Sequence, residues 1–186
     1  MRARYIPTPL PRATTSLGSG QLLSSDLIPA ESVMHEIRSA IHARLPWLGF
    51  TTRALLDALL LNSGSIGCAD CVAHRLGMRN RFQLAKTLRA NGLPPLHRLS
   101  AWMTVLGWVA GWEQAGASLS HSALRVGMEP AAGYRLVARV TGRSWSTVRS
   151  AGTPWVLSQF FRECGDGAIQ KRRGGIPRRS VTALQR

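Results

Sequence analysis

The stretch ALRVGMEPAAGYRLVARVTG (residues 123–142) repeats the frame of AHRLGMRNRFQLAKTLRANG (residues 73–92), fifty residues earlier in the chain. Both copies begin with Ala-x-Arg-[Leu/Val]-Gly-Met and both end on a glycine. The inner glycine is expected to end a short helix, because glycine adopts the left-handed conformation that helix ends often need. A longer helix follows it. Each copy is therefore predicted to form a short helix, a glycine turn and a second helix, which is the helix-turn-helix layout.

Positive charge is the dominant feature of the composition. The 186 residues include 24 Lys and Arg against 9 Asp and Glu, which gives a formal net charge of +15 and a pI near 11.7. A chain this basic attracts polyanions through electrostatic steering and counterion release, so double-stranded DNA is the first partner to expect. The alternative is a basic tail with solvated charged faces and no partner.

The apolar residues indicate a packed core without a membrane span. Hydrophobic residues make up 45% of the chain, whose length fits one ordinary domain or two very small ones. The longest strongly apolar run, residues 101–112, is shorter than the roughly 20 residues that a membrane-spanning helix needs. Residues 1–20 lack the apolar stretch of a secretory signal. We therefore expect a cytoplasmic, nucleoid-associated protein with no membrane partner.

The spacing of the apolar residues predicts helices, because no stretch of useful length alternates apolar and polar residues as a strand does. Residues 33–45 carry an apolar residue at every fourth position, and residues 51–62 form a second helix with Thr51 or Thr52 as its N-cap. Residues 96–112 are apolar on two sides, so this helix is expected to lie buried between two lobes. The predicted fold class is all-α, with two helix-turn-helix units joined by a long linker helix.

These features divide the chain into six segments. The first and the last are expected to be flexible, from their content of Pro, Ser, Thr and Gly or of basic residues. The predicted segments are a flexible N-terminal arm (1–29), a short helical extension (30–50), the first helix-turn-helix unit (51–92), the linker helix (93–116), the second unit (117–162) and a basic disordered tail (163–186).

Several side chains of the two units are expected to face the interior, and Ser120 is expected to cap the first helix of the second unit. Trp145 and Trp155 are interpreted as core residues and not as stacking platforms for bases. The expected inward residues of the two longer helices are Phe82, Leu84 or Ala85, Leu88, Tyr134, Val137 and Val140.

Cys68 and Cys71 form a Cys-x-x-Cys pair, which invites a redox or a zinc interpretation. Only His74 lies nearby, and the chain has no second pair of this kind. Cys68, Val72 and Leu76 fall at i, i+4 and i+8, which is the spacing of a buried helical stripe. We therefore expect both cysteines to be small buried or partly buried residues, with no metal and no cofactor.

The two copies and the segment between them resemble the DNA-binding domain of the AraC-type (AraC/XylS-like) transcriptional regulators. The second copy carries the stronger match, in which Ala123, Gly127, Tyr134, Thr141 and Gly142 fill the family's Ala-x-x-x-Gly, mid-helix aromatic and Thr-Gly pattern. The resemblance implies a bacterial transcription regulator that binds double-stranded DNA as a monomer or weak homodimer. RNA polymerase is a further partner for a regulator of this kind.

The candidate DNA contacts lie on the second helix of each unit, because a recognition helix turns its N-terminal residues toward the base edges of the major groove. Arginine pairs with guanine through two hydrogen bonds, and asparagine or glutamine does so with adenine. Phosphate contact and shape readout are expected in the second unit, whose helix begins with small residues. The predicted base contacts are Asn80, Arg81, Gln83 and Lys86, and the predicted phosphate or mixed contacts are Arg79, Arg89, Arg135, Arg139, Arg143 and Arg149.

Two other classes of function were weighed against a sequence-specific regulator. A low-specificity architectural or accessory DNA-binding protein fits the positive charge and the small side chains at the start of the second recognition helix. An enzyme is disfavoured, because the sequence has no phosphate-binding loop, no zinc-protease motif and no nucleophile elbow, and few carboxylates. No catalytic residue is therefore predicted.

Overall fold

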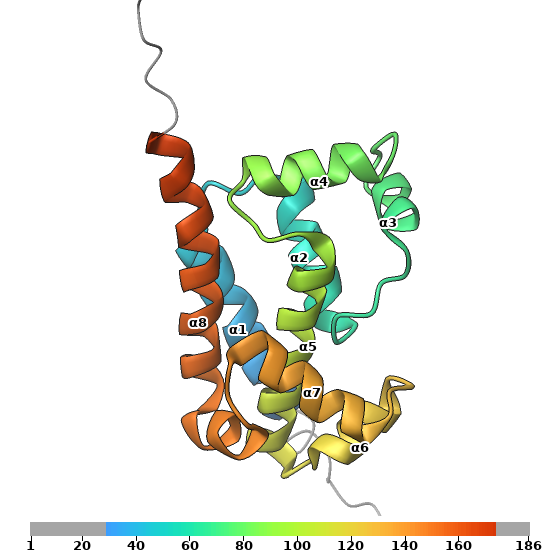
Figure 1. Cartoon of the computed structure of the whole chain (residues 1–186), viewed down its shortest axis with the longest axis vertical. Coiled ribbons are helices and arrows are strands. Elements are labelled where there is room, and N and C mark those ends of the chain that lie inside the picture. The colour runs from blue at the N-terminus through green and yellow to red at the C-terminus, as the bar shows by residue number, and fades with distance from the viewer. Residues whose placement is uncertain (1–28, 174–186) are drawn as a thin grey trace, which may run out of the picture.

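The computed structural model describes residues 29–173, with side chains described for residues 33–165. Within that range every regular element is a helix, which confirms the predicted all-α class (Figure 1). Most of the predicted N-terminal arm and the end of the predicted tail lie outside the described residues. The helices are α1 (Pro29–Arg44), α2 (Phe50–Leu61), α3 (Ala69–Arg75), α4 (Arg81–Ala90), α5 (Leu96–Ala115), α6 (Leu119–Arg125), α7 (Pro130–Thr141) and α8 (Trp145–Arg173).

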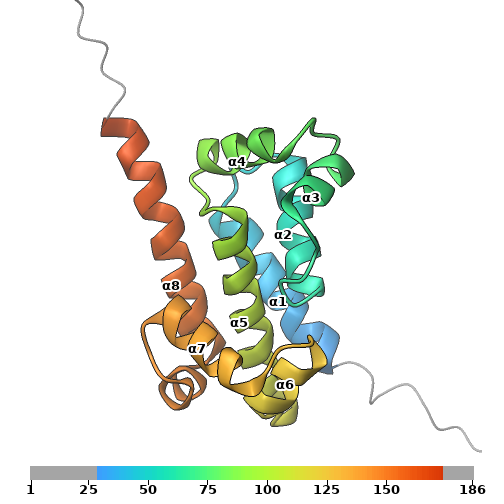
Figure 2. The ribbon, with the colours of Figure 1, turned by 45° about the vertical axis from the view of Figure 1, so that its right-hand side comes forward.

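The helix α5 runs through the middle of the fold. It packs against α1, α2, α7 and α8, which surround it in both views (Figures 1 and 2). Leu99 and Trp108 face opposite sides of the helix, since nine residues separate them, and both are buried. A helix that is apolar all round belongs inside a protein. This confirms the expectation that the helix between the two copies buries two of its faces.

The repeated Ala-x-Arg-[Leu/Val]-Gly-Met frame forms the same C-terminal cap on α3 and on α6. In both copies the methionine amide donates to the alanine carbonyl, and the glycine amide donates to the carbonyl of the residue after that alanine. This is the Schellman arrangement. The glycines have φ of 71° and 70°, a conformation that favours glycine. The four bonds are Met78 to Ala73 (2.8 Å), Gly77 to His74 (3.0 Å), Met128 to Ala123 (2.9 Å) and Gly127 to Leu124 (3.0 Å).

A kink divides α8 at Gly152, whose φ of 77° and ψ of 176° interrupt the helical backbone. The Glu113 carboxylate of α5 caps the segment that follows. It accepts from the Thr153 amide at 2.8 Å and from the Thr153 hydroxyl at 2.6 Å. A Cβ atom on residue 152 would lie 2.5 Å from a Glu113 oxygen, and the residue would have to adopt the same positive φ, so glycine is favoured here. The kink thereby joins the end of α5 to the second part of α8.

The second part of α8 continues beyond residue 162, where the sequence predicted a disordered tail to begin. Cys164 is buried in this extension and Phe160 just before it is fully buried. The first residues of the predicted tail are therefore helical and contribute to the core. Trp145, at the start of α8, is buried as predicted, and Trp155 is half-buried against the core.

Two predicted helix caps are wrong. The N-cap of α2 is Gly49 and not Thr51 or Thr52, and that of α6 is Ser118 and not Ser120. The Ser118 hydroxyl accepts from the amide three residues further on, as a cap does. In both cases the helix begins upstream of the predicted residue.

The predicted inward positions of Phe82 and Tyr134 are also wrong, since 69% and 46% of these residues are exposed. The buried stripe of α4, which begins at Arg81, consists of Leu84 and Leu88. Phe82 lies about 200° from Leu84 around the helix, which turns the phenylalanine outward. In α7 the buried stripe runs through Gly133, Val137 and Val140, and the tyrosine lies beside it. The two valines face inward as predicted.

Cys68 and Cys71 are exposed, which overturns the prediction that they are buried or partly buried. Cys68 is the N-cap of α3, with extended backbone angles, so it lies outside the helix. The spacing of Cys68, Val72 and Leu76 therefore does not describe one helical stripe, and only Val72 of the three is fully inside.

Candidate nucleic-acid interface

The two copies of the frame stand at the two ends of α5. The pair α3–α4 lies at its beginning and the pair α6–α7 lies over its second half (Figure 1). In both views α4 and α7 run from the side that carries α3 and α6 toward the side that carries α8 (Figures 1 and 2). The N-terminal ends of the two longer helices therefore lie on one side of the molecule.

The side chains of Asn80 and Gln83 close the beginning of α4. The Asn80 side-chain oxygen accepts from the amides of Phe82 and Gln83 at 3.1 and 3.0 Å. The Gln83 side-chain oxygen accepts from the Arg79 amide at 2.9 Å. The two-bond contact with adenine requires an amide oxygen as well as an amide N–H. In this conformation both oxygens are already engaged, so both residues offer N–H donors for contacts outside the chain.

Arg81 and Phe82 form an exposed pair on the first turn of α4. The Arg81 guanidinium carbon lies 5.1 Å from the centre of the Phe82 ring, within the range of a cation–π contact. The Arg81 amide donates at 3.0 Å to the Asp70 carboxylate of α3, which links the beginning of α4 to α3. Arginine is suited to guanine, and an exposed phenylalanine beside it can contact the methyl group of a neighbouring thymine. Sequence reasoning missed Phe82, although its spacing of two residues from Leu84 places it on the opposite side of the helix.

Lys86 and Arg135 occupy the same position in the two longer helices. The N-caps are Asn80 and Glu129, and each basic residue follows its N-cap by six residues. Both side chains are exposed. Arg135 lies 4.0 Å from the Glu129 carboxylate, but both partners are mostly in solvent, so this pair holds the guanidinium only weakly.

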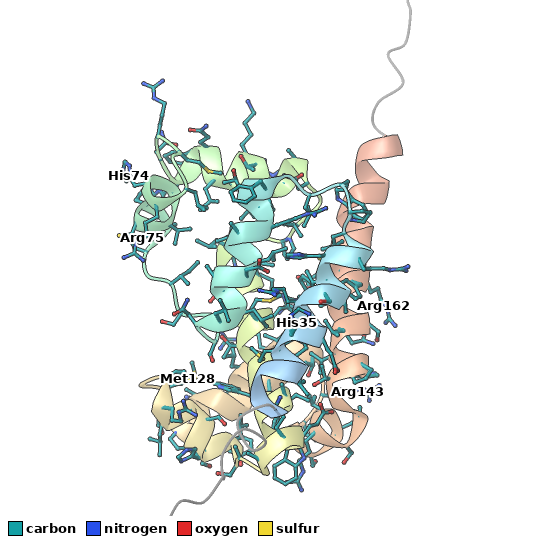
Figure 3. The ribbon with its side chains drawn as sticks, turned by 180° about the vertical axis from the view of Figure 1, so that it is seen from behind. His35, His74, Arg75, Met128, Arg143 and Arg162 are labelled. Carbon is teal, nitrogen blue, oxygen red and sulfur yellow. The ribbon has the colours of Figure 1, made fainter. Side chains whose placement is uncertain are left out.

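The remaining predicted arginines do not gather in one place. Arg89 and Arg139 are exposed near the C-terminal ends of α4 and α7. Figure 3 shows Arg143 on the side of α8, whereas Met128, before α7, lies on the side of α6. Arg149 lies over the Trp112 ring, with 4.8 Å from its guanidinium carbon to the ring centre. Arg143 therefore lies away from the side on which α4 and α7 begin, and Arg149 is held over an aromatic ring of α5.

Two exposed arginines that sequence reasoning did not select occupy the third position of the repeated frame. Arg75 ends α3 and Arg125 ends α6. Arg75 and its neighbour His74 point outward on the α3 side of the molecule (Figure 3). The signal was present in the sequence, because both copies share this arginine although most other exposed positions differ.

The chain matches no model of a known protein family, no curated protein and no solved structure. Among the described helices, none has the length and the apolar character to cross a membrane. Over the same residues, no three His, Cys, Asp or Glu side chains come together in a way that could hold a metal ion.

Proposed function

We propose that this chain is a sequence-specific transcription regulator of the AraC type, which binds double-stranded DNA with α4 and α7. The observation that carries the proposal is the equivalence of the two copies. Each consists of a short helix, a Schellman turn and a longer helix, and each longer helix exposes a basic residue six positions after its N-cap. The formal net charge of +15 supplies the attraction to a polyanion.

The first unit is the better candidate for reading bases. The beginning of α4 exposes the guanidinium of Arg81, the ring of Phe82 and the side-chain N–H groups of Asn80 and Gln83, which suit guanine, a thymine methyl group and acceptor edges respectively. Lys86, one turn further along the helix, suits a guanine or a phosphate.

The second unit is the better candidate for holding the DNA backbone. The first turn of α7 carries Ala131, Ala132 and Gly133, which offer no side-chain hydrogen bonds to base edges. Arg135 and Arg139 follow one turn apart, with Arg125 at the end of the preceding helix. Guanidinium groups without base-reading neighbours favour phosphate contacts and readout of DNA shape.

Both longer helices belong to one body, so they would enter successive segments of one major groove, roughly 34 Å apart. A single chain then binds an asymmetric site without a second copy. Binding of this kind is also consistent with a place in the cytoplasm on the nucleoid.

A low-specificity architectural protein is the second candidate, and a specific observation favours it. The first turn of α7 has only small side chains without hydrogen-bonding groups, and the side-chain oxygens of Asn80 and Gln83 already accept hydrogen bonds within the chain. Both features limit the number of base contacts that this conformation can make. Such a protein would bind mainly through its positive charge.

Sequencing the DNA that the protein retains would separate the two candidates. Purified protein is incubated with sheared genomic DNA at near-physiological salt, washed, and the bound fragments are sequenced. A sequence-specific regulator enriches a bipartite motif whose halves lie about one helical turn apart. Uniform retention that falls steeply as salt rises would replace the regulator with the architectural protein, and no retention would contradict both.

A further inference from the structure

Cys68 and Cys71 stand together on the surface at the beginning of α3. Both are exposed, and the Cys68 sulfur accepts from the Cys71 amide at 3.2 Å. The third cysteine of the described residues, Cys164, is buried in α8. The chain thus presents two accessible thiols side by side and keeps its third thiol inside the core.

The two thiols of the pair differ in character. The pKa of Cys68 is lowered, chiefly because the Cys71 thiol and amide donate hydrogen bonds to its sulfur. The pKa of Cys71 is raised, chiefly because its proton is held in that same hydrogen bond and because it faces the Cys68 charge. Burial raises the pKa of Cys164 to about 12. Reaction at a thiol requires the thiolate and access to solvent, so Cys68 is the nucleophile of the three.

We propose that Cys68 and Cys71 are a redox-active pair that exchanges between a dithiol and an intramolecular disulfide, with a low-molecular-weight disulfide as the oxidant. The Cys68 thiolate attacks one sulfur of the oxidant and its S–S bond breaks, so that one small thiolate leaves and takes up the proton that Cys68 released. Cys71 then loses its proton, and its thiolate attacks the Cys68 sulfur of the mixed disulfide. The second small thiol leaves with that proton. The two cysteines give up two electrons, and the oxidant becomes two thiols.

The position of the pair links it to the candidate interface. Asp70 lies between the two cysteines, and its carboxylate accepts from the Arg81 amide at the first residue of α4 at 3.0 Å. A disulfide that closes over Asp70 constrains the turn of α3 that makes this contact. An effect of oxidation on DNA affinity therefore rests on the proposed function, whereas the exchange chemistry itself does not.

Equilibration in glutathione buffers tests the exchange. The full chain is held at a series of reduced-to-oxidised glutathione ratios, quenched with acid, alkylated after unfolding, and mapped by peptide mass spectrometry. We expect both surface thiols to be lost together in one two-electron transition, with a Cys68–Cys71 disulfide that dithiothreitol reverses, while Cys164 stays alkylated. Two thiols that stay reduced in oxidised glutathione, stable glutathione adducts on both, or disulfides only between chains would overturn the proposal.

Single substitutions test the assigned roles. Cys71→Ser is expected to trap a glutathione adduct on Cys68, because the resolving thiol is gone. In Cys68→Ser, Cys71 loses the hydrogen bond and the charge that raise its pKa, so it is expected to react faster than in the parent. It is still expected to react several-fold more slowly than Cys68 in Cys71→Ser, whose sulfur keeps the hydrogen bond from the amide of residue 71. Equal reactivity of the two single variants would contradict the assignment of Cys68 as the nucleophile. Anisotropy of a DNA duplex with oxidised and reduced protein then gives the separate readout for DNA binding, and its failure leaves the exchange result intact.

Discussion

Arg98 of α5 and Glu163 of α8 meet in a two-pronged ion pair, with 2.9 Å between Arg98 Nε and Glu163 Oε1 and 2.9 Å between Arg98 Nη2 and Glu163 Oε2. The Arg98 guanidinium also donates to the carbonyls of Arg139 and Val140, both at 3.0 Å, at the end of α7. Trp102 Nε1 donates to the same carboxylate at 2.7 Å. One arginine therefore holds together three helices, α5, α7 and α8.

Removal of the Glu163 carboxylate is expected to destabilise the fold. Glu163→Ala leaves the Trp102 N–H and the Arg98 guanidinium without their acceptor, and hydrogen bonds to a charged partner contribute about 1.5–3 kcal/mol. We expect the free energy of unfolding in urea to fall by about 2 kcal/mol. Glu163→Gln is the matched control, because it keeps an acceptor oxygen and is expected to lose less. Equal stability of the alanine variant and the parent would show that the pair does not hold the helices together.

The same carboxylate is expected to make stability depend on pH. Burial raises the pKa of Glu163. The hydrogen bonds from Arg98 and Trp102 and the Arg98 charge together lower it by more, so the pKa of Glu163 lies below its ordinary value of 4.5. A lowered pKa contributes stability above the unfolded value and loses it as pH falls through the folded value. Urea unfolding from pH 6 to pH 3 should show a smaller loss for Glu163→Gln than for the parent. Parallel curves for the two proteins would contradict the shift.

Local chemistry made part of this structure predictable from the sequence. Few residues other than glycine adopt the left-handed conformation that ends a helix, so the C-terminal caps of α3 and α6 could be predicted from Gly77 and Gly127. The apolar faces of the central helix follow from periodicity in the same way. These features depend only on residues that lie close together in the sequence, so the local sequence is enough to predict them.

Features that depend on one helix start or on distant partners were not predictable. The exposure of Cys68 follows from its position before the first turn of α3. The pair of Arg98 and Glu163 joins residues 65 positions apart, and no local pattern connects them.

The kink in α8 predicts the effect of an alanine at Gly152. The new Cβ would lie 2.5 Å from a Glu113 oxygen and would require a φ of 77° that side chains rarely adopt, so we expect a loss of about 1–3 kcal/mol in urea unfolding. Gly111→Ala is the matched control, because this glycine lies inside α5 with open space around its missing Cβ. There alanine is expected to stabilise by about 0.5–1 kcal/mol. A neutral Gly152→Ala would mean that the kink relaxes without strain.

The equivalent positions of Lys86 and Arg135 predict contrasting effects on DNA binding. With a duplex taken from the retained fragments, each alanine variant should lower the slope of log affinity against log salt by about one, because each removes one positive charge near the DNA. Lys86→Ala should also relax the preference at one base pair, at a cost of about 1–3 kcal/mol for the preferred base, whereas Arg135→Ala should weaken all duplexes alike. The control is Arg162→Ala, an exposed arginine on α8 (Figure 3), which removes the same charge away from the beginnings of α4 and α7.

The outcome of this comparison depends on the face of the molecule that meets DNA. If Arg162→Ala lowers the salt slope as much as the other two variants do, the attraction comes from the net charge of the chain and not from Lys86 and Arg135. If the two helix variants lower it and Arg162→Ala does not, the side of the molecule on which α4 and α7 begin is the one that meets the phosphates. Fluorescence anisotropy at four or more salt concentrations measures each slope, and a panel of duplexes with single base changes measures the preference.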